Sequence, residues 1–309
     1  MSIRILKSYS KDSEQGTRAG TRGSLSNASD INKINDNEIV TNQEIKNQYE
    51  SKTLFELLND EFQSETIYST GLDFIDKPLE GGFAMGQLVT ITGEQEAGKT
   101  QLLNQILSNV ANGFKCLYFS LEFNKRQIVK YFQKKLNNQT IIKEALKNIY
   151  IITNDMIDAE ISNILGAIEH FIKEKETKFI AIDSTLAIYH KDYAGEQEIT
   201  EIFRQLQAVT LRNDVLLFVI SQSSKEDNKS NRISIFGSQK ANHYANIMLH
   251  IYFNRDNETR ELIFAKNKQT GRHDKIKLEF DRERLLFLPI KEKRNKGREG
   301  NKTLTLEDL

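Results

Sequence analysis

Residues 93–100 have the sequence GEQEAGKT, which matches the phosphate-binding pattern Gly-x-x-x-x-Gly-Lys-Thr. In such a loop, backbone N–H groups point at phosphate oxygens, the lysine reaches the terminal phosphates and the threonine hydroxyl ligates Mg²⁺. The apolar run LVTITG precedes the motif and the helical run KTQLLNQILSNVANG follows it, which is the context this chemistry requires. An accidental glycine-rich turn is the alternative. The predicted cofactors are ATP and Mg²⁺, and the predicted nucleotide-binding residues are Gly93, Glu94, Gln95, Glu96, Ala97, Gly98, Lys99, Thr100 and Gln101.

Two negative charges, Glu94 and Glu96, lie in this loop where a polyphosphate is expected. Because backbone groups form the cradle, the variable side chains can point outward. Lys99, the helix dipole and Mg²⁺ then supply the positive charge. We therefore interpret both glutamates as tolerated residues without a catalytic role.

Hydrolysis needs a metal-side carboxylate, a group that activates water and a sensor of the terminal phosphate. Asp183 ends the buried run FIAID, where a carboxylate is costly unless it serves Mg²⁺, so we assign it to the metal with Thr100; a helix N-cap is the alternative. Glu122 ends LYFSLE and is predicted to be the base for the attacking water, with a solvated glutamate as the alternative. Gln222 ends VLLFVISQ and is predicted to hydrogen-bond the γ-phosphate, unless it is an ordinary polar strand cap.

Buried strands and amphipathic helices alternate around these residues. The helical segment 196–213 carries one apolar stripe, and from Ile247 onward short strands follow one another too closely for helices. This pattern predicts an α/β fold with a mostly parallel central sheet flanked by helices, the ligand at the strands' C-terminal ends, and C-terminal β-hairpins. The predicted buried strands are 88–93, 116–122, 149–153, 179–184 and 215–222.

The ends of the chain differ from this core in composition. We predict a disordered arm over 1–50, a linker helix within 51–66 that includes TLFELLNDEF, the ATPase domain over 67–290 and a basic disordered tail over 291–309. The disordered ends could recruit a loader or a replication or recombination partner.

Charge and cysteine content narrow the function class. Lys plus Arg (43) equals Asp plus Glu (43), so nucleic acid would have to be bound by a local patch. The single cysteine, Cys116, excludes an internal disulfide, and the five histidines show no zinc-type spacing. With no apolar stretch of membrane-spanning length and no secretory signal, we expect a cytoplasmic protein without membrane contact.

Several stretches together resemble the RecA-like superfamily, most closely the C-terminal motor domain of DnaB-type replicative helicases. They are STGLDFIDKPLEGGFAMGQLVTITG, FSLEFNKRQIV, FIAIDSTLAIY, EQEITEIFRQLQAVTLRNDVLLFVISQ and LIFAKNKQTG, within residues 53–290. Two others, GEQEAGKTQ and FGSQKANHYANIMLHI, look more like RadA-type recombinases. The resemblance implies a RecA-like P-loop ATPase domain with Lys99, Thr100, Glu122, Asp183 and Gln222 in the roles argued above.

The resemblance also implies a homo-oligomer, a six-membered ring on single-stranded DNA in which each ATP site is completed by a neighbour. The family's trans-acting Lys and Arg fall at Lys266 and Lys268, so the arginine is replaced by lysine here. Their i, i+2 spacing puts both cations on one face of a strand, for which a solvated edge is the alternative.

A predicted DNA contact follows the sensor strand. The loop SSKEDNKSNRISIFGSQK could hold phosphates without reading bases, although an ordinary solvated loop is the alternative. Its cations are Lys225, Lys229, Arg232 and Lys240. We carry three functions from the sequence: a DnaB-like motor that translocates on or unwinds single-stranded DNA, a RadA- or KaiC-like ATPase that assembles without unwinding, and a nucleotide-binding adaptor without activity.

Overall fold

The computed structural model describes residues 53–59, 66–223, 233–235 and 237–290. The chain divides into two compact units, Met1–Glu61 and Phe62–Leu309. The first contains α2 (Leu54–Asn59), whose leading turn is closed by the Glu56 carboxylate, which accepts hydrogen bonds from the Thr53 backbone and hydroxyl. The predicted helix at 53–62 is therefore present from Leu54 to Asn59. The predicted arm 1–50 and tail 291–309 lie outside the described residues.

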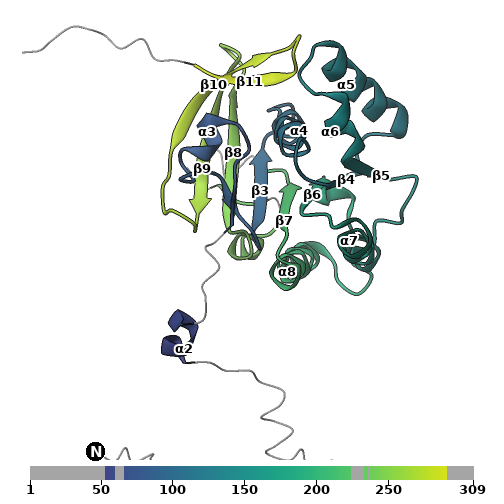
Figure 1. Ribbon diagram of the computed structural model, residues 1–309, viewed down its shortest axis with the longest axis vertical. Helices are drawn as coiled ribbons and strands as arrows, with labels where there is room; N and C mark the ends of the chain where they lie inside the picture. The colour runs from purple at the N-terminus through teal and green to yellow at the C-terminus, as the bar shows by residue number, and fades with distance from the viewer. Residues whose placement is uncertain (1–52, 60–65, 224–232, 236, 291–309) are drawn as a thin grey trace, which may run out of the picture. The chain divides into compact units, whose positions relative to one another are not determined.

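A nine-stranded sheet forms the centre of the second unit, in the order β11-β10-β9-β8-β3-β7-β6-β4-β5. The six strands from β8 to β5 are all parallel, so the prediction of a mostly parallel sheet is confirmed (Figure 1). Their bounds are β3 (Leu88–Gly93), β4 (Cys116–Ser120), β5 (Ile149–Thr153), β6 (Phe179–Asp183), β7 (Leu216–Ile220) and β8 (Ile247–Asn254).

Helices cover both faces of this sheet because its central strands are apolar on both sides. Tyr118 joins one buried cluster and its neighbour Phe119 the other, as the two-residue period of a strand dictates. The first cluster includes residues of α4 (Lys99–Val110), α5 (Lys125–Asn137) and α6 (Lys143–Lys147); the second includes residues of α7 (Ile161–Lys175) and α8 (Gly195–Asn213). The short α3 (Asp73–Asp76), η1 (Thr185–Ala187) and η2 (Lys240–His243) complete the described helical elements.

The C-terminal strands extend the sheet by successive antiparallel pairs, as predicted. β9 (Thr259–Asn267) pairs with β8, β10 (Lys275–Asp281) with β9, and β11 (Leu286–Pro289) with β10. Gln105 of α4 ties this extension to the core, since its amide donates to the Phe287 carbonyl at 3.1 Å and accepts from the Phe287 N–H at 2.7 Å. The extension is thereby held against the helix that begins at the phosphate loop.

A separate two-stranded sheet pairs β1 (Ile67–Tyr68) with β2 (Phe83–Ala84). Across the described residues, no helix combines the length and the apolar character needed to cross a membrane.

Candidate nucleotide-binding and hydrolysis site

The phosphate loop connects the carboxyl end of β3 to the N-terminus of α4, as the motif requires. Its two glycines cannot be replaced without movement. Gly93 has φ 154° and a Cβ there would lie 2.6 Å from the Ile251 carbonyl oxygen; Gly98 has φ 105° and a Cβ would lie 2.6 Å from the Phe287 ring. The motif's glycines are thus needed for close packing as well as for backbone conformation.

The Lys99 ammonium folds over the loop that precedes it. It donates to the carbonyl oxygens of Gly93 at 3.0 Å and Glu94 at 2.8 Å. Burial lowers the pKa of Lys99, while the nearby Glu122 and Asp183 carboxylates act in the opposite direction. The cation therefore lies inside the site, within the field of both predicted hydrolytic carboxylates.

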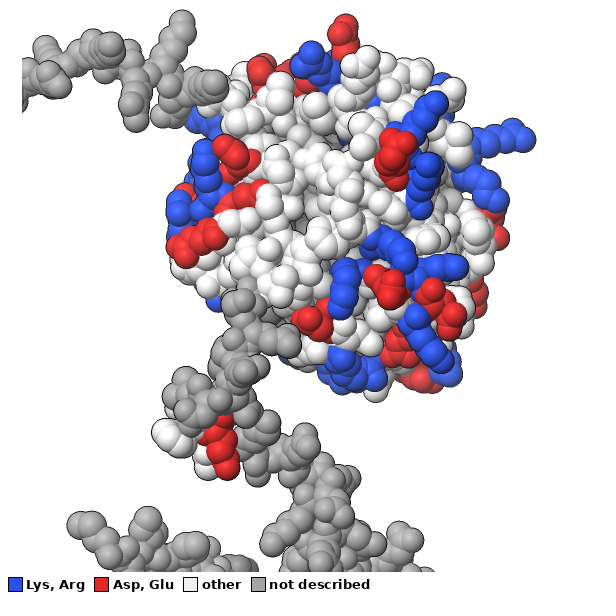
Figure 2. All heavy atoms as spheres, viewed as in Figure 1, with Lys and Arg blue, Asp and Glu red and all other residues white. Residues whose placement is uncertain are grey.

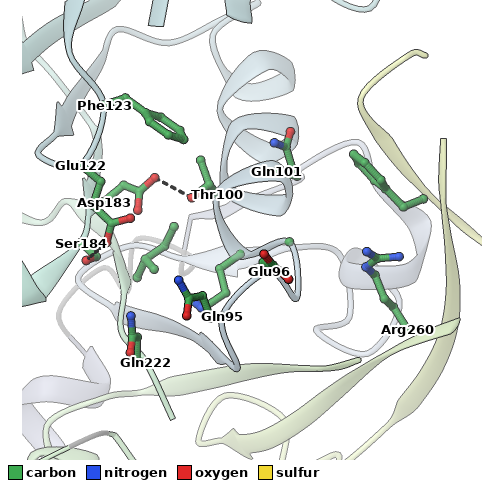
Figure 3. Close-up of a pocket in the computed structure, with 14 residues that line it drawn as sticks. Gln95, Glu96, Thr100, Gln101, Glu122, Phe123, Asp183, Ser184, Gln222 and Arg260 are labelled. Atoms are coloured by element: carbon green, nitrogen blue, oxygen red, sulfur yellow. Dashed lines mark hydrogen bonds between the residues drawn. The ribbon is translucent and has the colours of Figure 1, made fainter. Parts of the chain in front are cut away.

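Thr100 and Asp183 meet directly. The Thr100 hydroxyl donates to Asp183 Oδ2 at 2.8 Å, and the buried Tyr118 hydroxyl lies 3.3 Å from the same oxygen (Figure 3). Burial raises the pKa of Asp183 to about 6, and the Glu122 carboxylate adds to that rise, while the Thr100 hydrogen bond opposes it. The other oxygen, Oδ1, is buried without a hydrogen-bond partner among the described residues. A carboxylate oxygen and a hydroxyl at one point suit Mg²⁺, so these two residues fit the predicted metal.

Glu122 lies beside this pair. It follows β4, and its N–H lies 3.3 Å from the Asp183 carbonyl, so the β4–β6 ladder continues to the predicted base. Its carboxylate accepts a hydrogen bond from the Ser184 hydroxyl, which fixes one of its oxygens. Ser184 was missed by sequence reasoning, although it directly follows Asp183.

These groups share one pocket of about 350 Å³. Figure 3 shows Gln222 on the side of Gln95 and Arg260 beyond Glu96. Of the predicted residues, the pocket is lined by Gln95, Glu96, Gly98, Lys99, Thr100, Gln101, Glu122, Asp183 and Gln222. Gly93, Glu94 and Ala97 belong to the same loop but do not line the pocket. Residues that were not predicted complete the wall: Phe123, Ser184, Ile220, Arg260 and Phe280.

Arg260 is the main addition to the predicted site. Its guanidinium lies 4.2 Å from the ring centre of Phe253 and 5.5 Å from that of Phe280, and its Nε donates to the Ala97 carbonyl at 3.1 Å. Burial lowers its pKa. A cation stacked on aromatic rings thus ties β9 to the phosphate loop. The sequence offers no motif for it, because Arg260 is separated from Ala97 by 163 residues.

The two acidic residues of the loop differ in placement. Glu96 has φ 66°, a left-handed conformation, and lines the pocket, whereas Glu94 does not. The outward direction expected for both side chains is therefore wrong for Glu96. Because its backbone is left-handed, its side chain follows a course that the pattern of variable positions did not indicate.

Lys266 and Lys268 lie away from this pocket, at the end of β9, which runs antiparallel to the strands that carry the phosphate loop (Figure 1). Both ammonium groups reach the C-terminal carbonyls of η2: Lys266 donates to Asn242, and Lys268 to His243 at 3.1 Å. Burial, together with the Lys268 charge, lowers the pKa of Lys266 to about 8. The predicted shared face is thus occupied within the chain.

Lys240, the described member of the predicted DNA contact, is exposed and begins η2. It belongs to the element that Lys266 and Lys268 cap. The other predicted members, Lys225, Lys229 and Arg232, lie outside the described residues.

A family model described as "ATPase: KaiC" matches residues 68–283, which contain the whole of this site. The chain belongs to this KaiC ATPase family. Among curated relatives, the DNA repair protein RadA of Aquifex aeolicus is 29% identical over 214 residues, 68% of this chain and 43% of that protein. The DNA repair protein Rad51 homolog of Drosophila melanogaster is 27% identical over 140 residues, 42% of this chain and 40% of that protein. The chain spans less than half the length of these relatives.

Two solved structures share the fold. The KaiC-like protein PH0186 of Pyrococcus horikoshii OT3 has a TM-score of 0.59 at 19% identity, covering 74% of this chain and 100% of that one. The ATPase domain of a DnaB-type helicase has a TM-score of 0.60 at 18% identity, covering 77% of this chain and 96% of that one. The expected RecA-like P-loop ATPase fold, with features of both helicase and KaiC or RadA ATPases, is confirmed.

Proposed function

We propose that this KaiC-family ATPase hydrolyses ATP as a homo-oligomer on single-stranded DNA, as a DnaB-like motor that translocates on or unwinds it. The observation that carries the hydrolytic part is the convergence of Thr100, Asp183 and Glu122 on one pocket beside Lys99. The name of the RadA relatives supports a role in DNA transactions.

In the proposed reaction, a water oxygen attacks the γ-phosphorus, its proton passes to the Glu122 carboxylate, and the bond to the β–γ bridging oxygen breaks to release ADP. Ser184 holds the carboxylate that receives the proton. Lys99 binds the terminal phosphates, and Gln222 contacts the γ-phosphate. Bound Mg²⁺ would be held by Thr100 and Asp183, and it supplies charge neutralisation at the phosphates.

The neighbouring subunit is proposed to complete this site through Lys268, assisted by Lys266. Both residues lie at the end of β9 opposite the pocket, so a second copy could present them to it. In that role the ammonium groups would exchange the η2 carbonyls for the phosphates of the neighbour's nucleotide. Lysine supplies charge without the bidentate fork of arginine, so hydrolysis is expected to be slow.

A RadA- or KaiC-like ATPase that assembles on DNA without unwinding it is the second candidate. The family match and the lysine at position 268 favour it. The test measures ATP hydrolysis with and without oligothymidine, and then strand displacement on a forked duplex. Stimulation with displacement supports the motor, and stimulation alone supports the second candidate. Absence of hydrolysis under both conditions rejects both in favour of a nucleotide-binding adaptor.

A further inference from the structure

The positive charge of this chain is concentrated in one described segment. Residues 124–148 carry seven Lys or Arg and a single acid, Glu144, a net charge of +6 in a chain whose total is zero. The segment forms α5 and α6. Figure 2 shows blue side chains projecting over the region where Figure 1 places α5. A neutral protein therefore has a strongly cationic face.

Three exposed cations form a row along α5. Arg126, Lys130 and Lys134 follow one another at i, i+4 and i+8, so they lie on one side of the helix about 6 Å apart along its axis. The thirteen residues of α5 include no acid. We call these three residues the α5 row.

This arrangement does not serve the stability of the helix. Like charges at i, i+4 repel, and a cation in the first turn opposes the helix dipole. Among the described residues, neither Arg126 nor Lys130 forms an ion pair that would offset the repulsion, while Lys134 donates to the Arg282 carbonyl at 3.0 Å. A local rule broken without a compensating contact is typical of a functional surface.

The α5 row is rigidly connected to the hydrolysis site. Asn124 begins α5 with a capping box, in which its side chain and that of Gln127 exchange hydrogen bonds with each other's backbone N–H at 3.0 Å. Asn124 follows Glu122 by two residues, and the intervening Phe123 lines the pocket. A ligand held on α5 would therefore lie close in the chain to the predicted base.

We propose that the α5 row binds the sugar–phosphate backbone of a nucleic-acid strand, as a contact separate from the predicted loop at 223–240. A linear row of cations complements a linear array of phosphates. Exposed Gln127 and Gln133 add donors for phosphate oxygens. Val129, exposed by 58%, is the large apolar side chain that α5 exposes, too little for the apolar centre of a protein interface. The occupant is inferred from the proposed function on DNA; the charge pattern is independent of it.

The test compares two double variants of the full chain. Arg126→Gln/Lys130→Gln removes two charges from the α5 row, and the matched control Lys173→Gln/Lys175→Gln removes two exposed charges from α7. Binding of a fluorescent oligothymidine is followed by anisotropy over a range of salt concentrations. The row variant should bind several-fold more weakly, and its log–log salt slope should fall by about 1.4 relative to the control, because each lost contact to a single strand contributes about 0.7.

Two further readouts keep the result interpretable. The melting temperature of the row variant should equal or exceed that of the wild type, because the substitutions relieve repulsion. Basal ATP hydrolysis should be unchanged, while the oligothymidine concentration for half-maximal stimulation should rise.

Equal affinity and equal salt slope in both double variants would overturn the inference, and DNA-stimulated hydrolysis in the wild type would then leave the proposed function standing. Wild-type protein that binds polyglutamate through the α5 row but not oligothymidine would overturn it in favour of an acidic protein partner. Wild-type protein that binds neither polyanion would contradict both the inference and the DNA part of the proposed function.

Discussion

The Thr100 hydroxyl donates to Asp183 Oδ2 at 2.8 Å, joining the first turn of α4 to the end of β6 across 83 residues of sequence. The second Asp183 oxygen is buried without a described hydrogen-bond partner. The two residues thus form a preorganised oxygen-ligand pair before any metal binds.

Thr100→Val tests this pair, because valine keeps the shape and removes the hydroxyl. The ATP affinity measured by calorimetry with Mg²⁺ should fall by about 10- to 100-fold, the range found when metal-site partners are removed. The affinity measured with EDTA should remain that of the wild type. Equal losses under both conditions would mean that Thr100 supports the fold of the loop and not the metal.

Arg260→Ala should weaken ATP binding by about tenfold, because it removes the stacked guanidinium that lines the pocket and holds the Ala97 carbonyl. Arg260→Lys is the matched control. It keeps the charge but loses the planar stack, so it should recover only part of the affinity. Wild-type affinity in a folded Arg260→Ala protein would exclude Arg260 from nucleotide binding.

His250 predicts a pH dependence of stability. It lies behind the loop, with Nδ1 3.1 Å from the Thr92 hydroxyl, and burial, with the Lys99 charge, lowers its pKa to about 4. Below the ordinary pKa of about 6.5, the unfolded chain gains a proton that the folded chain does not, so stability falls as the pH drops. Between pH 7 and pH 5 this single group should remove about 2 kcal/mol of unfolding free energy.

The comparison is urea unfolding at both pH values for the wild type and for His250→Asn. The variant should lose about 2 kcal/mol less over this interval, because other titrating groups act equally in both proteins. The same pH dependence in both proteins would show that His250 is not the group responsible.

Lys268 tests the sharing of sites between subunits. Lys268→Ala subunits keep an intact Lys99, and Lys99→Ala subunits keep an intact Lys268, so mixed oligomers should recover hydrolysis where the two intact residues meet. Lys268→Arg should hydrolyse ATP at least as fast as the wild type, because arginine adds a bidentate fork. Mixed oligomers that form but stay inactive at every ratio would leave Lys268 with the role seen in the structure, holding the His243 carbonyl.

The sequence predicted best what short contiguous segments determine. The loop from Gly93 to Thr100 is recognisable because its chemistry lies in consecutive backbone groups and in the adjoining strand and helix. The strand ends that carry Glu122 and Asp183 followed from apolar runs, and parallel pairing then brought them together. These predictions depend on local patterns alone.

Long-range register determined what the sequence left out. Arg260 reaches the loop because β9 pairs antiparallel with β8, and no local pattern encodes that alignment. Period two correctly placed Lys266 and Lys268 on one face, but their contact with η2 depends on where that element packs. The direction of Glu96 depended on a left-handed backbone that few residues other than glycine adopt.

In the proposed reaction, ATP hydrolysis depends on Glu122 as the base. The most direct measurement compares the wild type with Glu122→Gln, in which the amide keeps the side chain's shape but cannot accept the proton. Calorimetry should give ATP affinities that agree within a few-fold, while single-turnover hydrolysis should fall by about 10²- to 10⁴-fold. Hydrolysis by Glu122→Gln at the wild-type rate, with ATP binding intact, would contradict this role.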